Sequence, residues 1–574
     1  MKESKTCPCD SMKKLLLLLA LILLPLAVSA VNFIDGIYYN LNSDTKTAEV
    51  VQYISKKYSG DFVIPSSVTV EGINYKVTSV AASAFTGCSD LTSITIPNSV
   101  TTIGKKAFEN CTALTSVTIP DGVTSIGDMA FYYCIGLTSI TIGKNVETIY
   151  HETFGCCNLK KVDINSSAIV SNDYKLSSLN YYFGYQVEEY IIGESIKSIG
   201  NYAFFGCEKL KAVSIPSSVT SIGDFAFHKC SALTSITIPN SVESMGEGVF
   251  FLCENLSSIN LSTSLTTIEK ETFFKCKSLT SIDIPNSVTE IRENAFEECY
   301  NLSSITVPDG VTIGFQAFDK TAWYTSQPNG VVYLGNHLYT YKDKYNMPEN
   351  TSIDIKEGTC SIAEYAFQFC SNIVSITIPN SMKRIGKGAF QGCKGLTSIT
   401  LPNSVSSIGS FAFSSCSALK SITIPNSVTT IECLFPVCTS LTSVIIGSGV
   451  TSIHDEAFMK CQSIKDLYCY AEQVPETNNP LIFAESNIRN ATLHVPAGSL
   501  EAYRNAEQWK DFGSIVALTD EDPKPTTDIN TPPGIQMPAI VERYSIDGKR
   551  ISSPQSGLNI IRMSNGTTKK VFVK

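Results

Sequence analysis

The sequence predicts a repeat solenoid, in which short, similar turns of chain stack side by side and form a parallel β-sheet along one face. Three observations support this prediction. Cysteine recurs at intervals of mostly 23 residues, and a phenylalanine stands three residues before each of these cysteines. Within each interval, apolar and polar residues alternate over a short run, which is typical of a half-buried strand. The composition, 43% hydrophobic and 17% charged, is that of a folded chain.

The repeat is defined by its cysteine positions. Fourteen of the 20 cysteines share one phase, and a fifteenth copy has Thr321 where the cysteine would stand. The recurring unit is Leu-x-x-Ile-x-Ile-Pro-x-x-Val-x-x-Ile-Gly-x-x-Ala-Phe-x-x-Cys. A period in the twenties with this pattern indicates a leucine-rich-repeat solenoid. The cysteines of this phase are Cys88, Cys111, Cys134, Cys157, Cys207, Cys230, Cys253, Cys276, Cys299, Cys370, Cys393, Cys416, Cys438 and Cys461.

Each copy predicts one turn of the solenoid. In the copy that ends at Cys111, residues 91–96 alternate and predict a strand with its apolar side chains inward. Pro97 begins a turn, and residues 103–108 predict a short helical or irregular segment that returns along the other side. A single copy cannot bury enough apolar surface to offset the cost of ordering its backbone, so each copy needs neighbours.

The regular cysteines allow two interpretations. A disulfide framework is one, since adjacent cysteines would lie roughly 4.8 Å apart, a distance that does not exclude pairing. Buried, reduced thiols that fill a small apolar position are the other. We expect the second, because Thr321 takes the same position without loss of phase.

The N-terminus predicts export. Lys13 and Lys14 precede an apolar run over residues 15–26, and small residues follow at 27–30. This order is typical of a cleaved secretory signal peptide, here residues 1–30, and the run is too short for a membrane span. We therefore expect a mature chain that begins near Val31 and contains no membrane span.

The remaining chain divides around the repeats. We expect a small β cap before the solenoid, a second cap after it, a Pro-rich linker, and a small C-terminal β module of three strands. Two insertions interrupt the phase, and Asn329-Gly330 in the second predicts a hairpin turn. These parts are residues 31–82 (N-terminal β cap), 83–465 (solenoid), about 165–195 and 322–359 (insertions), 466–518 (C-terminal cap), 519–538 (linker) and 539–574 (β module).

The sequence predicts neither an enzyme nor a cofactor or metal site. The five histidines fall in different repeats or caps, and His151 beside Cys156 and Cys157 is better explained as a surface histidine next to a core cysteine. Asp163 and Asp283 stand several repeats apart, so they cannot act as a carboxylate pair. The net charge of −9 gives no electrostatic reason to bind nucleic acid or an anionic membrane.

Two surfaces are candidates for ligand contact. The first is the strand position between the two inward isoleucines, which is mostly threonine; such a face serves solubility and strand propensity, or acts as a broad, weak contact surface. These threonines are Thr95, Thr118, Thr141, Thr237, Thr306, Thr377, Thr400 and Thr423. The second is the aromatic group of the second insertion, which supplies binding anchors or merely covers a gap between two repeat blocks. Its members are Trp323, Tyr324, Tyr333, Tyr339 and Tyr341.

The unit Ser-Ile-Thr-Ile-Pro-Asn-Ser-Val-Thr-x-Ile-Gly, followed by Ala-Phe-x-x-Cys, resembles the BspA-like leucine-rich repeat over residues 83–465. This resemblance implies an exported protein of the cell surface, associated with the outer membrane, that adheres to host extracellular matrix or to other bacteria. Its partners would be proteins or surface glycans. A purely structural surface-layer or spacer protein is the alternative.

The C-terminal module carries a second resemblance. Residues 544–550 (Tyr-Ser-Ile-Asp-Gly-Lys-Arg), Gly557-Leu558 and the final Lys-Val-Phe-Val-Lys are similar to the sorting domain of type IX secretion cargo. The resemblance implies secretion through that system and attachment at the surface. A plain terminal β module is the alternative.

Overall fold

A computed structural model describes residues 31–52, 57–175, 177–477, 479–525, 540–545, 549–551, 557–563 and 568–573. The expected signal peptide, residues 1–30, lies outside the described residues, as does most of the expected linker, residues 526–538. The chain divides into two compact units. Unit 1 extends to Pro308 and includes Gln316–Gln327, whereas unit 2 holds Asp309–Phe315 and the chain from Pro328.

Unit 1 begins with antiparallel strands that lead into the solenoid. β2 pairs with β1 and β3, while β6 pairs antiparallel with β5 and parallel with β3. β6 also pairs with β8, the first two-residue strand of the repeats, so this segment joins the stack directly. The strands are β1 (Asn32–Ile34), β2 (Ile37–Asn42), β3 (Thr47–Val51), β4 (Gly60–Val63), β5 (Ser67–Val70), β6 (Ile73–Val80) and β8 (Thr102–Ile103).

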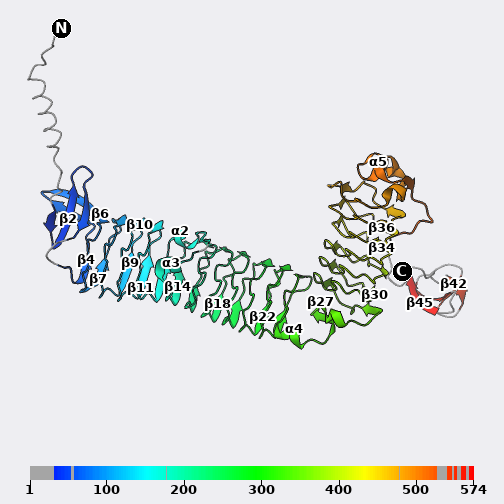
Figure 1. Cartoon of the computed structure of the whole chain (residues 1–574), viewed down its shortest axis with the longest axis horizontal. Coiled ribbons are helices and arrows are strands. Elements are labelled where there is room, and N and C mark those ends of the chain that lie inside the picture. Colours follow the sequence, from blue (N-terminus) through cyan, green and yellow to red (C-terminus); the bar gives the residue numbers. More distant parts are fainter. Residues whose placement is uncertain are drawn as a thin grey trace, which may run out of the picture. The chain divides into compact units, whose positions relative to one another are not determined.

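The main strands of unit 1 follow one another along the unit, one per turn (Figure 1). Those that pair do so in parallel and in register, as in the run β9, β11, β13, β14, β16. The main strands are β7 (Leu91–Thr95), β9 (Ser116–Ile119), β11 (Ser139–Ile142), β13 (Lys161–Ile164), β14 (Glu189–Ile192), β16 (Ala212–Ser214), β18 (Ser235–Thr237), β20 (Ser258–Asn260), β22 (Ser281–Asp283) and β24 (Ser304–Thr306).

The opposite side of unit 1 carries a second ladder of two-residue parallel strands, each followed by irregular turns rather than a helix. The isoleucine or methionine of each short strand is buried, which explains the second apolar position of the repeat. With β8, these strands are β10 (Ser125–Ile126), β12 (Thr148–Ile149), β15 (Ser198–Ile199), β17 (Ser221–Ile222), β19 (Ser244–Met245), β21 (Thr267–Ile268) and β23 (Glu290–Ile291). The predicted solenoid with one parallel sheet face is therefore confirmed.

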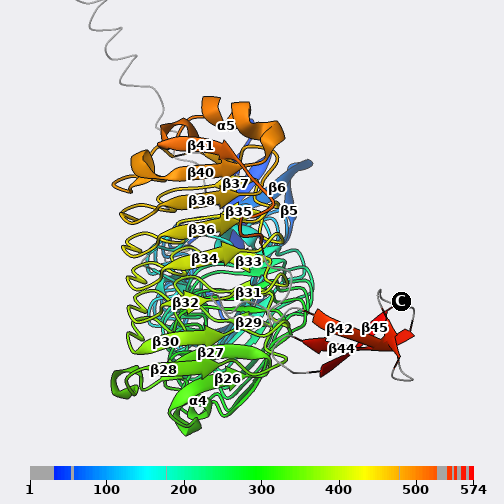
Figure 2. The same ribbon diagram turned by 90° about the vertical axis from the view of Figure 1, so that its right-hand side faces the viewer.

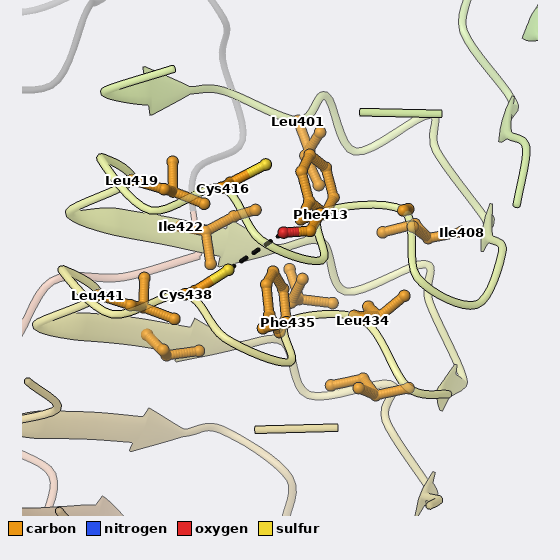
Figure 3. Close-up of a cluster of buried hydrophobic side chains, with 14 of the residues drawn as sticks. Leu401, Ile408, Phe413, Cys416, Leu419, Ile422, Leu434, Phe435, Cys438 and Leu441 are labelled. Atoms are coloured by element: carbon orange, nitrogen blue, oxygen red, sulfur yellow. Dashed lines mark hydrogen bonds between the residues drawn. The ribbon is translucent and has the colours of Figure 1, made fainter. Parts of the chain in front are cut away.

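In most turns the core is a phenylalanine stacked on the phenylalanine of the next turn, although Tyr190 lies edge-on between Phe183 and Phe204. Phe204 and Phe227 stack with ring centroids 4.9 Å apart and an interplanar angle of 2°. The repeat cysteine packs beside this stack, and its Sγ–H donates to the phenylalanine carbonyl of the preceding turn. Figure 3 shows this bond between Cys438 and the Phe413 carbonyl oxygen, at 3.1 Å.

The first insertion is a complete solenoid turn. It contains α2 (Ser167–Val170) and α3 (Asn180–Phe183), and its strand β14 pairs in register with β13. Phe183 enters the stack, with its ring 5.5 Å from that of Phe154. Gln186 stands where the cysteine would be and donates to the carbonyl of Cys157 at 3.0 Å. The insertion therefore breaks the 23-residue spacing in the sequence but does not break the stack of turns.

The second insertion contributes to both units. Thr321 caps α4 (Ala322–Ser326) in unit 1. In unit 2, β26 (Gly330–Leu334) and β27 (His337–Lys342) form an antiparallel hairpin. The predicted turn at Asn329-Gly330 is wrong, because Gly330 is the first residue of β26 and faces Lys342. The turn lies at Gly335-Asn336, where Gly335 adopts a positive φ of 57°.

Unit 2 repeats the same two-ladder turn, and Figure 2 shows its later main strands stacked beneath α5. The main strands are β28 (Thr351–Asp354), β30 (Ile373–Thr377), β32 (Ser398–Ile399), β34 (Ser421–Ile424), β36 (Ser443–Ile446), β38 (Asp466–Cys469), β40 (Thr492–Val495) and β41 (Ser514–Ala517). The short strands are β25 (Thr312–Ile313), β29 (Ser361–Ile362), β31 (Arg384–Ile385), β33 (Ser407–Ile408), β35 (Thr430–Ile431), β37 (Ser452–Ile453) and β39 (Glu476–Thr477).

The last turns of unit 2 are closed by helical segments and large aromatic side chains. Trp509 and Tyr503 are fully buried, and the Trp509 ring meets that of Phe483 edge-on at 5.8 Å. The helical segments of unit 2 are η1 (Lys344–Asn346), η2 (Ile488–Asn490), η3 (Ala497–Ser499), α5 (Leu500–Asn505) and η4 (Trp509–Asp511).

The described part of the C-terminal module contains four antiparallel strands, one more than expected. β44 pairs with β42 and β45, and β42 also pairs with β43. They are β42 (Ile540–Ser545), β43 (Arg550–Ile551), β44 (Gly557–Met563) and β45 (Thr568–Val573).

Candidate recognition surface

The outer face of the main sheet carries the predicted threonines. In unit 1, Thr118 lies directly opposite Thr141 on the neighbouring strand. Side chains on such neighbours are separated by one strand spacing, about 4.8 Å. Five of the eight threonines are exposed, whereas Thr141, Thr400 and Thr423 are half-buried. The exposed ones are Thr95, Thr118, Thr237, Thr306 and Thr377.

The hydroxyls on this face are of two kinds. At the flanking position, the hydroxyl donates to the backbone of the preceding turn, as from Thr138 to the Thr115 carbonyl at 3.3 Å and from Thr442 to the Lys420 carbonyl at 3.0 Å. In the predicted column, Thr237 accepts from the Asn260 amide at 3.4 Å. Within the described residues, the hydroxyls of the other seven column threonines have no hydrogen bond to protein. Seven of the eight column hydroxyls are therefore available to solvent or a ligand.

The column in unit 1 is interrupted by a charged belt. Beyond Thr141, the register continues through Asp163 and Ile191. Beside them, Glu188 accepts from Lys160 at 3.0 Å and Lys211 at 2.7 Å, and these bonds lower its pKa to about 2. The sequence analysis missed Ile191, because it treated this turn as an insertion.

In unit 2 the column changes character towards its end. Thr423 is followed in register by Ile445, Tyr468 and His494. The rings of Tyr468 and His494 stack with centroids 4.3 Å apart and an interplanar angle of 23°. Near its end, before Val516 on the last strand, the outer face therefore carries an aromatic and ionisable corner rather than threonine.

The aromatic group of the second insertion does not form one exposed cluster. Tyr339 is only 2% exposed, so its predicted role as a contact residue is wrong; its side chain belongs to the core of unit 2. Tyr333 and Tyr341 are half-buried in the same unit, and the Tyr333 hydroxyl accepts from the Lys356 backbone N–H at 3.1 Å. In unit 1, Trp323 meets Phe318 edge-on at 6.1 Å, and burial raises the pKa of Tyr324 to about 12. These contacts favour the interpretation that the rings cover gaps in the stack.

A set of exposed tyrosines lies instead in and beside the first insertion: Tyr181 is on α3, Tyr185 follows that helix, and Tyr150 comes just after β12. Tyr150 and Tyr181 are 53% and 54% exposed, and Tyr185 is 73% exposed. The ring of Tyr181 meets that of His151 at 5.9 Å. The sequence analysis did not consider them, although Tyr150 takes a position that is usually glycine in the repeat, a visible signal of a departure from the structural pattern.

The Cys157 thiol and the His151 ring, which the sequence brings close together, have structural partners. The Cys157 Sγ–H donates to the Phe131 carbonyl at 3.1 Å, while the His151 Nδ1 lies 4.0 Å from an Asp128 carboxylate oxygen. A further contact that the sequence analysis did not consider joins His337 Nδ1 to Ser361 Oγ at 2.6 Å. Both side chains are buried, at 1% and 3% exposure, so a substrate could not reach them.

In the described part of the chain, no group of three or more His, Cys, Asp or Glu side chains is arranged to hold a metal ion. None of the helices that the structure describes combines the length and apolar character that crossing a membrane requires.

The chain matches the model of one protein family, described as the BspA type leucine rich repeat region (6 copies). The match covers residues 65–181, 174–303 and 339–465. No curated protein matches the chain.

Several solved structures are similar to this chain. A leucine-rich repeat protein from Bacteroides ovatus is 24% identical, covers 78% of this chain and 99% of its own, and gives a TM-score of 0.25. The pneumococcal vaccine antigen PcpA is 19% identical, with 86% and 99% coverage and a TM-score of 0.29. A leucine rich cell surface protein from Faecalibacterium prausnitzii is 25% identical, with 86% and 95% coverage and a TM-score of 0.22. At these TM-scores the chains do not superpose as wholes.

The matched residues fall within the stretch that the structure folds into repeated turns. Because the matched segments together span more than half of the sequence, the chain belongs to the family of BspA-type leucine-rich-repeat proteins.

Proposed function

We propose that this chain is an exported cell-surface protein that recognises protein or surface glycan ligands through the threonine column of its main sheet. The observation that supports this proposal is the set of outward hydroxyls that form no hydrogen bond within the described protein. Each hydroxyl contributes little alone, and the strength of binding comes from repetition along the strands.

The proposed location rests on the two ends of the chain. Residues 1–30 act as a cleaved signal peptide, and residues 539–574 act as a sorting domain for type IX secretion that leaves the protein associated with the outer membrane. Between them, we propose the division into N-terminal cap, solenoid, C-terminal cap and linker at residues 82, 465 and 518. A role without catalysis fits a family whose repeats are committed to stacking.

A purely structural spacer is the second candidate, and one observation favours it. The flanking hydroxyls bond to the preceding turn, as Thr397 does to the Val374 carbonyl at 3.2 Å, so hydroxyl-rich strands also stabilise the stack. A spacer would bind no ligand specifically, and that difference separates the two functions.

The test is a fourfold variant with lysine at Thr237, Thr306, Thr377 and Thr400, compared with the single variant Thr237→Lys. Purified protein is offered immobilised matrix proteins, a glycan array and whole bacteria. We expect the wild type to bind at least one of these saturably, the single variant to bind slightly less, and the fourfold variant to lose binding. Four cations, two on the column of each unit, replace neutral hydroxyls and sterically block the face.

A matched control carries the same added charge on exposed turn residues, two in each unit: Thr266→Lys, Asn286→Lys, Asn380→Lys and Thr429→Lys. Circular dichroism must show the same fold in all variants. The control should bind like the wild type. If the fourfold column variant also binds like the wild type, the threonine column is not the contact surface; absence of saturable binding by the wild type would favour the spacer.

A further inference from the structure

The end of the main sheet in unit 2 differs from the rest of the column. Tyr468 and His494 stack on the outer face, and Asp466 lies beside them, with its Oδ1 3.3 Å from His494 Nε2. The Tyr470 hydroxyl belongs to the same region, just after β38. This corner offers two ring faces, a hydroxyl donor and an imidazole next to a carboxylate, none of which the repeat pattern requires.

Residues 519–525, here named the strap, lie against this corner. The segment leaves β41 with the Leu518 N–H donating to the Val495 carbonyl at 2.8 Å. The backbone N–H and the hydroxyl of Thr519 then donate to the Asp522 carboxylate, at 2.6 and 3.0 Å, which closes a turn. The turn places Asp522 Oδ1 3.7 Å from His494 Nδ1, and the Tyr470 hydroxyl donates to the Pro523 carbonyl at 3.1 Å.

The strap is held by these polar contacts and not by an apolar core. Its sequence, Thr-Asp-Glu-Asp-Pro-Lys-Pro, contains no large apolar side chain. Of its residues, Asp522 and Pro525 are half-buried and the other five are exposed. The Asp522 and His494 side chains are only 13% and 15% exposed, so both are largely shielded from solvent where they meet. Few polar contacts near a surface stabilise a segment only modestly, so the strap can detach without unfolding the unit.

The contacts define the chemistry of what the corner holds. The imidazole of His494 favours a carboxylate as its neighbour. The Tyr470 hydroxyl favours a backbone carbonyl one residue later, and a proline at that residue fixes the backbone in an extended form. Burial, and then the Asp522 charge, raise the pKa of the Tyr470 hydroxyl, which therefore stays protonated and able to donate. The preferred occupant is a short acidic peptide that contains Asp-Pro.

We propose that this corner is a binding site for acidic, Asp-Pro-containing peptide segments, and that the strap occupies it until a segment of a partner protein displaces it. The site lies beyond the proposed function, because none of the eight column threonines takes part in it. The strap is tethered beside the site, and tethering gives it an effective concentration of roughly millimolar. An outside peptide therefore binds well only when the strap is weakened.

The experiment measures binding of a fluorescent peptide with the sequence of residues 519–525 to the full chain by anisotropy. In the variant Asp522→Ala, the strap loses its carboxylate whereas the peptide keeps its own. We expect the peptide to bind this variant at least about tenfold more tightly than the wild type, a difference of about 1.4 kcal/mol. A peptide with alanine in place of that aspartate should not bind.

Two further chains complete the test. The first is Asp520→Ala, which removes another carboxylate from the strap. Because the Asp520 side chain is fully exposed and faces Lys524, this variant should bind the peptide as weakly as the wild type does. Adding His494→Gln to Asp522→Ala should abolish the gain. The proposal is overturned if folded Asp522→Ala binds the peptide no better than the wild type, or if the His494→Gln double variant still binds it. Either result would show that the strap is a fixed part of the fold. This conclusion is independent of whether the threonine column binds a ligand.

Discussion

At each regular turn of the solenoid, the cysteine thiol fills a position too small for a larger apolar side chain and donates one hydrogen bond. Cys253 donates to the Phe227 carbonyl at 3.0 Å and Cys299 to the Phe273 carbonyl at 3.1 Å. Thr321 takes the same position, but its hydroxyl donates to the carbonyl of Phe318 in its own turn, at 2.7 Å. At the regular turns this position thus holds a small side chain with a donor rather than a disulfide.

Free-thiol counting tests this account of the cysteines. Burial raises the pKa of Cys370 and Cys461 to about 12, so at neutral pH both stay protonated and unreactive. Among the described cysteines of the native protein, a thiol reagent should react with the exposed Cys156 and, more slowly, with the half-buried Cys360. After denaturation, most of the fourteen repeat cysteines should react. Protein purified from an anaerobic culture in which most of the fourteen are oxidised would contradict this account.

His228 predicts a pH dependence of stability. Its ring is stacked between Phe205 and Phe251, at 4.7 and 4.9 Å, and burial lowers its pKa from 6.5 to about 4. Below about pH 6.5 the His228 ring is protonated in the unfolded chain but stays neutral in the folded chain. Its contribution to the free energy of unfolding is therefore fully present above that pH and falls as the pH drops towards 4.

Thermal unfolding between pH 4 and pH 8 checks this, with His228→Phe as the comparison. Phenylalanine keeps the stack and cannot be protonated, so the variant should lose less stability than the wild type as the pH falls. The difference between the two melting temperatures should therefore widen towards pH 4. Parallel curves for both proteins would exclude His228 as a source of the pH dependence.

At the scale of the element, the sequence predicts the main strands, which follow the repeat, and misses the elements that depart from it. The alternating runs predict the main strands, because two inward side chains per strand leave a period-two pattern. The first insertion was misjudged, because Gln186 replaces the cysteine and α3 replaces the usual turn, yet Phe183 still stands three residues before Gln186. The short strands were not predicted, since two residues are too few to show alternation.

The candidate site was predictable to a lesser degree. Outward positions follow from the strand pattern, so the threonine column could be named before the structure was known. The burial of Tyr339 and the hairpin turn at Gly335-Asn336 could not, because both depend on how β27 packs against neighbouring turns. The strap was missed because a polar, Pro-rich segment has no periodicity that would predict where it lies.

Deleting residues 165–192 tests whether the first insertion is one turn. Ile164 and Ile192 are register partners, so the deletion joins Ile164 to Gly193 as Ile192 is now joined. We expect a folded chain with unchanged strand content per residue, as measured by circular dichroism. Deleting only residues 172–186 keeps β14 but removes Phe183, and this should lower the melting temperature markedly, because the stack loses one ring. Equal stability of both deletions would contradict the assignment of a full turn.

At the scale of the whole molecule, each unit is closed where its stack ends. In unit 1, antiparallel strands β1 to β3 precede the first repeat, and in unit 2, Tyr503 and Trp509 pack against each other edge-on at 5.3 Å. An uncovered final turn would expose a ladder of backbone donors and acceptors to other chains. Covering these two ends therefore disfavours edge-to-edge pairing with the strands of other chains.

Removal of residues 539–574 tests the proposed sorting role. Because a Pro-rich segment precedes these residues, the remaining chain should unfold at the same temperature as the full chain. Surface display should fall strongly, measured by antibody labelling of intact cells that use type IX secretion. A replacement of the same residues by a Gly/Ser-rich segment of equal length controls for chain length. Undiminished display of the truncated protein would remove the sorting hypothesis.

Residue-for-residue register between successive strands gives this gene an unusual freedom to change. The turn between Cys416 and Cys438 has 22 residues instead of 23, and the one between β13 and β14 has 28, yet both return the chain to the same alignment. Duplication or loss of one repeat by unequal recombination would lengthen or shorten the outer face by about 4.8 Å, one strand. Only the two turns that flank the duplicated or lost repeat would contact new neighbours. Selection can therefore change the length of the outer face by one turn at a time while the chain still folds.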